Sequence, residues 1–252
     1  MRQPWSGGCL LLMILVVADH AAIGFTQSDS ADGSGCEAVR TVFGVSARVI
    51  VDSAALKELD NDVGTLANCM PPGAVLELDL PELVLENFVE LSSPITIKGN
   101  GASVRCPSDQ SKGAFKIRSD DMTLSALFFK GCFLNSTEGL IHVQHSKNFT
   151  LEQVEFEGNE NVGEGPAGLS AAESEFTLLN VKARNNNGSF GGVIAALDNS
   201  QATILNSNFT RNEALKSGGA IYLQETTVTI RESTFEWNKA SGEGGAIFAE
   251  VN

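Results

Sequence analysis

The sequence predicts an all-β fold, a parallel β-solenoid, and three observations lead to this prediction. Leu or Ile recurs every 26 or 27 residues, at positions 97, 124, 151, 178, 204 and 230. Within each repeat, apolar and polar residues alternate over short stretches, which is typical of strands with one buried face. Gly-Gly pairs recur with the same period, and glycine suits corners where a Cβ would clash. One such unit cannot bury its apolar face alone, so the units must stack around a continuous core.

Residues 1–24 have the outline of a secretory signal peptide. An apolar run at 9–18 lies between Arg2 and mostly small residues at 21–24. These ten residues would rise about 15 Å as a helix, roughly half the hydrocarbon thickness of a bilayer. We therefore expect cleavage at the end of this segment and a secreted mature chain without a membrane-spanning segment.

Residues 25–74 are expected to form an N-terminal segment with a capping helix. An alternating strand is predicted at 47–51, and Ser53 is a plausible N-cap for a helix over 53–66. Such a helix would cover the first turn, because an uncapped stack exposes strand edges and an open core. The repeats then occupy 75–252. No comparable cap follows the last repeat, so we expect an uncapped or truncated C-terminal end.

Four cysteines remain after removal of the signal segment, which contains Cys9. An even number in an oxidising compartment favours disulfides. Cys106 and Cys132 are 26 residues apart, which places them nearly in register on adjacent turns. The second predicted bridge ties Cys36 to Cys69, while other pairings and buried free thiols stay open.

Four Asn-X-Ser/Thr sequons agree with secretion and favour a eukaryotic source, where they would make the protein a glycoprotein. They lie at Asn135, Asn148, Asn187 and Asn208.

Charge and motif content exclude several functions. The chain has 17 Lys and Arg against 31 Asp and Glu, a formal net charge of −14. Nucleic acid is therefore not expected as a partner, because phosphate attraction requires a basic surface. Lys130, Glu157 and Arg184 fall on successive turns, which predicts ion pairs of little energetic weight between strands. Zinc-type Cys/His spacing and phosphate- or Ca²⁺-loop signatures do not occur, so we expect no cofactor and no metal.

Two tetrapeptide motifs recur in the second half of the chain, Gly-Gly-(Ala/Val)-Ile and Phe-x-x-Asn. Their repeated residues are Gly191, Gly192, Gly218, Gly219, Gly244 and Gly245 for the first motif, and Phe156, Asn159, Phe209, Asn212, Phe235 and Asn238 for the second. The phenylalanines are expected in the core. The asparagines suit turns, and stacking would align them as an amide ladder.

The pairing of these motifs resembles the repeats of the chlamydial polymorphic outer membrane protein family and, more loosely, right-handed β-helix proteins of the pectin-lyase-like fold. The likeness covers residues 149–252, while 75–148 fit the period without the motifs. It implies a right-handed parallel β-helix. In that family it also implies a surface-displayed adhesin, which for a bacterial source means the outer membrane.

Candidate catalytic residues are few. Asp120 and Asp121 resemble the carboxylate pairs of glycosidases, but the equivalent positions on neighbouring turns carry no cluster of acids. We therefore interpret the pair as a polar turn. His142 and His145 are three residues apart, so on one strand they face opposite sides and form a poor metal pair.

The function that the sequence favours is non-catalytic binding by a secreted or surface-exposed β-helix protein. Adhesion to a cell-surface protein or a glycan would use the outward residues Arg211, Tyr222 and Trp237. Trp237 is preferred, because an exposed indole stacks on sugar or anchors a protein contact. Two alternatives stay open: a fragment of a carbohydrate-active enzyme of pectin-lyase-like fold, and a passenger fragment of a bacterial autotransporter.

Overall fold

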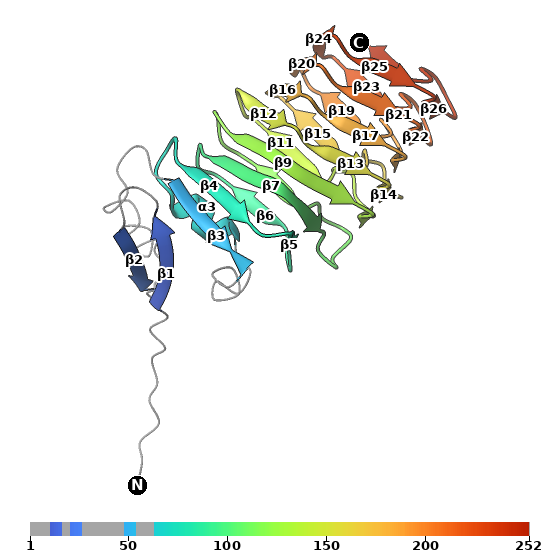
Figure 1. The fold of residues 1–252 in the computed structure, drawn as a ribbon. Coiled ribbons are helices and arrows are strands. Elements are labelled where there is room, and N and C mark those ends of the chain that lie inside the picture. The colour runs from blue at the N-terminus through green and yellow to red at the C-terminus, as the bar shows by residue number, and fades with distance from the viewer. Residues whose placement is uncertain (1–10, 17–20, 27–47, 54–62, 252) are drawn as a thin grey trace.

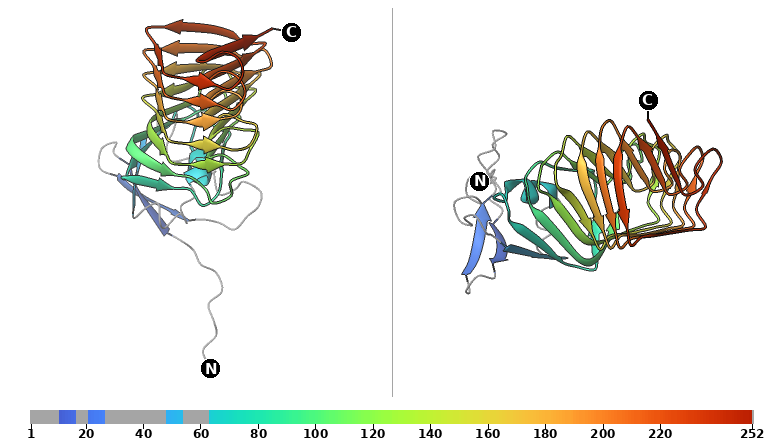
Figure 2. Two further views of the ribbon diagram at one scale, coloured as in Figure 1. Left: turned by 90° about the vertical axis from the view of Figure 1, so that its right-hand side faces the viewer. Right: turned by 90° about the horizontal axis from the view of Figure 1, so that it is seen from above.

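The computed structural model describes residues 11–16, 21–26, 48–53 and 63–251, and most of them form a parallel β-helix (Figure 1). The chain winds through three parallel sheets that run along the stack (Figure 2). The all-β parallel solenoid predicted from the sequence is confirmed.

The first sheet consists of β3 (Arg48–Asp52), β4 (Val75–Asp79), β5 (Glu82–Val84), β7 (Thr96–Arg105), β9 (Thr123–Lys130), β12 (Phe149–Glu152), β13 (Glu155–Glu157), β16 (Glu175–Leu179), β17 (Lys182–Arg184), β20 (Gln201–Leu205), β21 (Asn208–Thr210), β24 (Thr227–Arg231) and β25 (Thr234–Glu236). The second sheet consists of β6 (Val89–Leu91), β8 (Phe115–Ile117), β11 (Ile141–Gln144), β15 (Leu169–Ala172), β19 (Ile194–Leu197), β23 (Ile221–Gln224) and β27 (Ile247–Glu250). The third sheet consists of β10 (Phe133–Leu134), β14 (Glu160–Asn161), β18 (Asn187–Gly188), β22 (Glu213–Ala214) and β26 (Lys239–Ala240).

The predicted repeat is confirmed by the strand register. The six predicted positions are successive Cα partners, in the order Ile97, Leu124, Leu151, Leu178, Ile204 and Ile230. All of them lie in or against the core, and only the last is partly exposed. The stack also extends below the first repeat, because β3 pairs in parallel with β4.

The Asn ladder predicted from the Phe-x-x-Asn motif is present. Asn159 Nδ2 donates to Asn186 Oδ1 at 3.0 Å, and Asn212 Nδ2 donates to Asn238 Oδ1 at 3.0 Å. Each amide also donates to a backbone carbonyl of the turn below, as Asn186 Nδ2 does to Phe156 O at 2.9 Å. The ladder thus satisfies buried polar groups that the close packing of turns removes from water.

The Gly-Gly motif forms a corner that only glycine fits. Gly218 has φ +70°, and a Cβ built there would lie 2.2 Å from the carbonyl oxygen of Ile221. Because no real Cβ approaches backbone so closely, the first glycine of the motif is a requirement of the fold.

The N-terminal end carries α3 (Val63–Cys69) and an antiparallel hairpin of β1 (Leu11–Val16) and β2 (Ala21–Thr26) beside β3 (Figures 1 and 2). The predicted capping helix is described only over α3, which continues beyond the predicted end at 66, and residues 54–62 lie outside the described residues. Among the residues that the structure describes, no helix has the length and apolar character to cross a bilayer.

The predicted bridge between Cys106 and Cys132 is formed, with a Cα–Cα distance of 5.7 Å. Cys69 is also disulfide-bonded. Its predicted partner, Cys36, lies outside the described residues, so that pairing stays a prediction.

Candidate functional site

An open groove of about 300 Å³ lies on the outer side of the first sheet, where β17 and β21 end. It is lined by Lys182, Ala183, Arg184, Asn185, Asn208, Thr210 and Arg211. The strand residues come from two adjacent turns, since Lys182 pairs with Asn208 and Arg184 with Thr210. Alternation along these strands buries Ala183 and Phe209 and turns their neighbours outward.

Two of the three cations in the groove are neutralised from the turn below. Lys182 Nζ lies 3.0 Å from Glu155 Oε1, and Arg184 Nη2 lies 3.0 Å from Glu157 Oε2. Lys130 Nζ contacts the same Glu157 oxygen at 3.2 Å, so the column of alternating charge predicted from the sequence is confirmed. Hydrogen bonds from Lys130 and then Arg184 hold the pKa of Glu157 below its usual value.

Arg211 differs from its two cationic neighbours. In the described part of the chain its guanidinium takes part in no ion pair. Its backbone N–H donates to Glu236 O on the next turn at 2.9 Å. The groove therefore contains one positive charge without a matching carboxylate.

Arg211 and Trp237 occupy equivalent corners on adjacent turns. The corresponding residues on the three preceding turns are Gly131, Gly158 and Asn185, and all five have positive φ, between +54° and +64°. Glycine and asparagine adopt this conformation at low cost, whereas larger side chains do so less readily. Trp237 is 80% exposed.

The structure brings together two of the three predicted binding residues. Arg211 and Trp237 lie one turn apart, about 4.8 Å along the stack, and we call them, with the groove residues, the corner surface. Tyr222 belongs instead to β23 in the second sheet and is only 7% exposed, because its ring packs between Phe190 and Phe248. Burial and a hydrogen bond to Glu250 raise the pKa of its hydroxyl to about 12.

The four sequons differ in accessibility. Asn135, Asn148 and Asn208 are exposed. Asn187 lies in β18, and its Oδ1 is buried without a hydrogen-bond partner. Thr210 Oγ1 donates to Asn208 Oδ1 at 2.6 Å, so the sequon hydroxyl already contacts its asparagine there.

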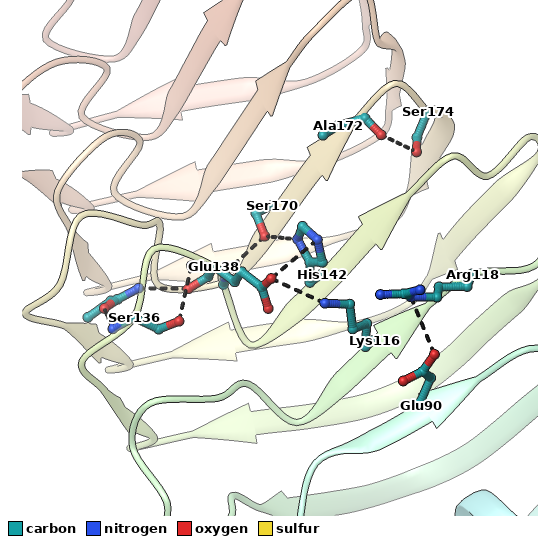
Figure 3. Close-up of polar contacts among 11 residues, drawn as sticks. Glu90, Lys116, Arg118, Ser136, Glu138, His142, Ser170, Ala172 and Ser174 are labelled. Atoms are coloured by element: carbon teal, nitrogen blue, oxygen red, sulfur yellow. Dashed lines mark hydrogen bonds and ion pairs between the residues drawn. The ribbon is translucent and has the colours of Figure 1, made fainter.

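A partly buried polar cluster on the second sheet was not predicted from the sequence (Figure 3). His142 Nδ1 lies 2.9 Å from Ser170 Oγ, and His142 Nε2 lies 3.5 Å from Glu138 Oε1. Lys116 Nζ approaches the same Glu138 oxygen at 3.4 Å. Burial lowers the pKa of His142, against the opposing effect of Glu138 and with minor help from Lys116 and Arg118.

Ser170, His142 and Glu138 contact one another in the sequence of a Ser-His-Glu catalytic triad, but their surroundings indicate a structural role. Ser170 is 6% exposed, and its Oγ already accepts the Gly139 N–H at 3.0 Å. A nucleophile needs access to its substrate, which this oxygen lacks. The cluster instead fixes the segment before β11 against β15. The i,i+4 spacing of Glu138 and His142 was the one available signal in the sequence.

The acidic pair also has a structural role, as predicted. Asp120 Oδ1 accepts the backbone N–H of Lys147 at 2.8 Å, and Asp121 Oδ1 accepts from Asn148 Nδ2 at 2.9 Å. Both carboxylates therefore tie one turn to the next. Within the described ranges, no three His, Cys, Asp or Glu side chains gather as metal ligands would.

A family model described as "Right handed beta helix region" matches residues 110–252. The matched region contains the corner surface and the whole cluster of Lys116, Glu138, His142 and Ser170. No curated protein and no solved structure matches the chain.

Proposed function

Since the chain belongs to the right-handed β-helix family, whose fold alone defines no activity, we propose that it is a secreted or cell-surface binding protein that acts without catalysis. Its ligand is a glycan, held at the corner surface. The observation that supports this most is the 80% exposure of Trp237 on a positive-φ corner beside Arg211.

The fold does not require large side chains at these two corners. Glycine serves at the same position in two other turns, and a left-handed conformation costs a non-glycine residue roughly 1–2 kcal/mol. Binding is the role that an exposed indole next to a guanidinium supports.

The chemistry of the groove favours a glycan over a protein ligand. Asn185, Asn208 and Thr210 supply amide and hydroxyl groups, which are both donors and acceptors, as a hydroxyl-rich ligand requires. The groove volume of about 300 Å³ stands at the lower end of the range of small-molecule sites. One or two sugar rings are therefore the natural occupant.

The proposal includes two further points, that the protein is secreted and that it acts in adhesion. The signal-peptide outline of residues 1–24 and the sequons support secretion. The likeness of the Gly-Gly and Phe-x-x-Asn motifs to polymorphic outer membrane protein repeats supports an adhesive role at a cell surface.

The test is direct binding of the full chain to a glycan array, followed by calorimetry on the positive glycans. Trp237→Ala should weaken binding at least tenfold, whereas the control Phe133→Ala, which removes a 40% exposed ring from β10, should not. Turnover of a glycan that is abolished by Asp121→Asn would contradict the non-catalytic proposal. So would glycan binding that is unchanged in Trp237→Ala.

A further inference from the structure

We propose that the glycan bound at the corner surface carries an acidic group, a carboxylate or a sulfate ester, and that Arg211 receives it. The inference rests on the proposed function and specifies its ligand class. It follows from the distribution of charge in the groove.

The groove is cationic in a strongly acidic chain. Three cations line it although the net charge of the chain is −14. Lys182 and Arg184 are each held by a glutamate on the turn below. Arg211, which follows β21 on the next turn, has no such partner among the described residues, so the unmatched charge is available to a ligand.

The neighbouring groups suit an acidic sugar. A guanidinium presents planar paired donors, which match a carboxylate or a sulfate oxygen pair. Asn208 Oδ1 is occupied by the Thr210 hydroxyl, which leaves the amide N–H groups of that side chain to donate to sugar oxygens. Trp237, one turn further, offers a face on which a sugar ring can stack.

Besides Glu155 and Glu157, which pair with two of the groove cations, Glu236 places a negative charge near the groove that would repel an anion. Glu236 is the Cα partner of Thr210 and lies on the turn that follows the groove. Among the described residues its side chain forms no ion pair with Arg211. Removal of the Glu236 charge should therefore strengthen the binding of an acidic ligand, while removal of the Arg211 charge should weaken it.

The experiment measures calorimetric affinity of the full chain at fixed ionic strength for two pairs of probes. Oligogalacturonate is compared with its methyl ester, and a sulfated oligosaccharide with its unsulfated form, so the two pairs distinguish carboxylate from sulfate. At least one acidic probe should bind tenfold or more tightly than its neutral counterpart. Arg211→Gln should abolish that ratio, and Glu236→Gln should raise it about two- to fivefold, as partly screened single charges do.

The matched control is Arg231→Gln. Arg231 is an exposed arginine at the end of β24, does not belong to the residues that line the groove, and also lacks an ion pair in the described residues. The ratio should be unchanged in this variant. An equal loss in Arg231→Gln would show a non-specific charge effect and overturn the inference.

The remaining outcomes separate the inference from the proposed function. If acidic and neutral probes bind equally and both depend on Trp237, the acidic ligand class is wrong and glycan binding stands. If no probe and no arrayed glycan binds, both fail. Thermal unfolding of each variant checks that the exposed substitutions leave the fold intact.

Discussion

Asn186 donates its amide Nδ2–H to Asn212 Oδ1 at 2.9 Å, one turn further along the stack, and both side chains are buried. The same Oδ1 accepts the backbone N–H of Asn186 at 3.1 Å. A single side chain thus satisfies two buried donors of its neighbour. This double acceptance by one amide oxygen is a physical reason for asparagine at this position of the motif.

Asn212→Ala should lower the free energy of unfolding by about 3 kcal/mol, because it leaves two buried N–H groups of Asn186 without acceptors. Denaturant titration measures the loss. Asn238→Ala removes the same two acceptors from Asn212, but it does so in the partly exposed last turn, where water can replace them, so it should cost less. An equal loss of unfolding free energy at both positions would show that the stabilisation by the ladder does not depend on burial.

Phe209→Ala should cost about 3–5 kcal/mol, because the ring is fully buried and its removal leaves a cavity. The ring stacks on Phe235 at a centroid distance of 4.8 Å. Phe235→Ala should cost clearly less, since that side chain is only half-buried. Chemical denaturation of both variants checks the order, and a larger loss at 235 would contradict it.

Replacement of Cys106 and Cys132 by serine should destabilise the protein by roughly 3–4 kcal/mol, because the bridge closes a loop of 26 residues. Thermal and denaturant unfolding of the double variant give the magnitude. Peptide mapping without reductant checks the pairing itself. An alkylated free thiol at Cys132 would refute it.

Acidification should destabilise the folded chain through His142. Burial holds its folded pKa below the value of 6.5 that the unfolded chain has. The unfolded state therefore binds more protons in the window from the folded pKa up to about 6.5, so stability rises with pH across that window and is lost as pH falls through it.

The measurement is the free energy of unfolding between pH 5 and pH 8. His142→Gln should show a shallower slope, because the titrating group is gone. His145→Gln removes an exposed imidazole that pairs with Glu173 and serves as the control. A slope unaffected by His142→Gln would assign the acid sensitivity to other groups.

In a glycosylating host, a glycan on Asn187 should oppose folding, because it would extend from a side chain whose Oδ1 is buried and whose strand pairs on the third sheet. The folded protein should therefore carry none at this position. Asn135, Asn148 and Asn208 are exposed and can carry a glycan. Mass spectrometry of peptides before and after deglycosylation measures the occupancy. A glycan attached at Asn208 lies in the groove and should abolish ligand binding, which expression in a host without N-glycosylation should restore.

The features that could be predicted from the sequence are those that recur with the regular spacing of the strands in the first sheet. Leu151, Leu178 and Ile204 follow one another by 27 and 26 residues in that sheet, so alignment of the repeats located the core and the Asn ladder. The second sheet is less regular. Ile141 to Leu169 spans 28 residues and Leu169 to Ile194 spans 25.

That irregularity explains what the sequence could not predict. His142 pairs with Ser170 across the 28-residue turn, which a fixed period of 26 or 27 does not align. Tyr222 faces outward by alternation, but Phe190 covers it from a loop, and the position of a loop side chain is not encoded in strand periodicity. Arg211 and Trp237 follow the inward Phe209 and Phe235 by two residues, so strict alternation would point them inward, and the positive-φ corner turns them outward instead. Their exposure was predicted from their place between the Phe and the Asn of the repeated motif.

The corner column has an evolutionary consequence. Each turn contributes one residue to this corner column, and the residue varies in the series Gly131, Gly158, Asn185, Arg211 and Trp237, while the position beside it is an asparagine in the last four of these turns. Mutation can therefore exchange the displayed side chain on one turn while the neighbouring turns keep theirs. Single substitutions in such an array can change which ligand it binds. Duplication of a turn adds another variable position and leaves the other turns unchanged.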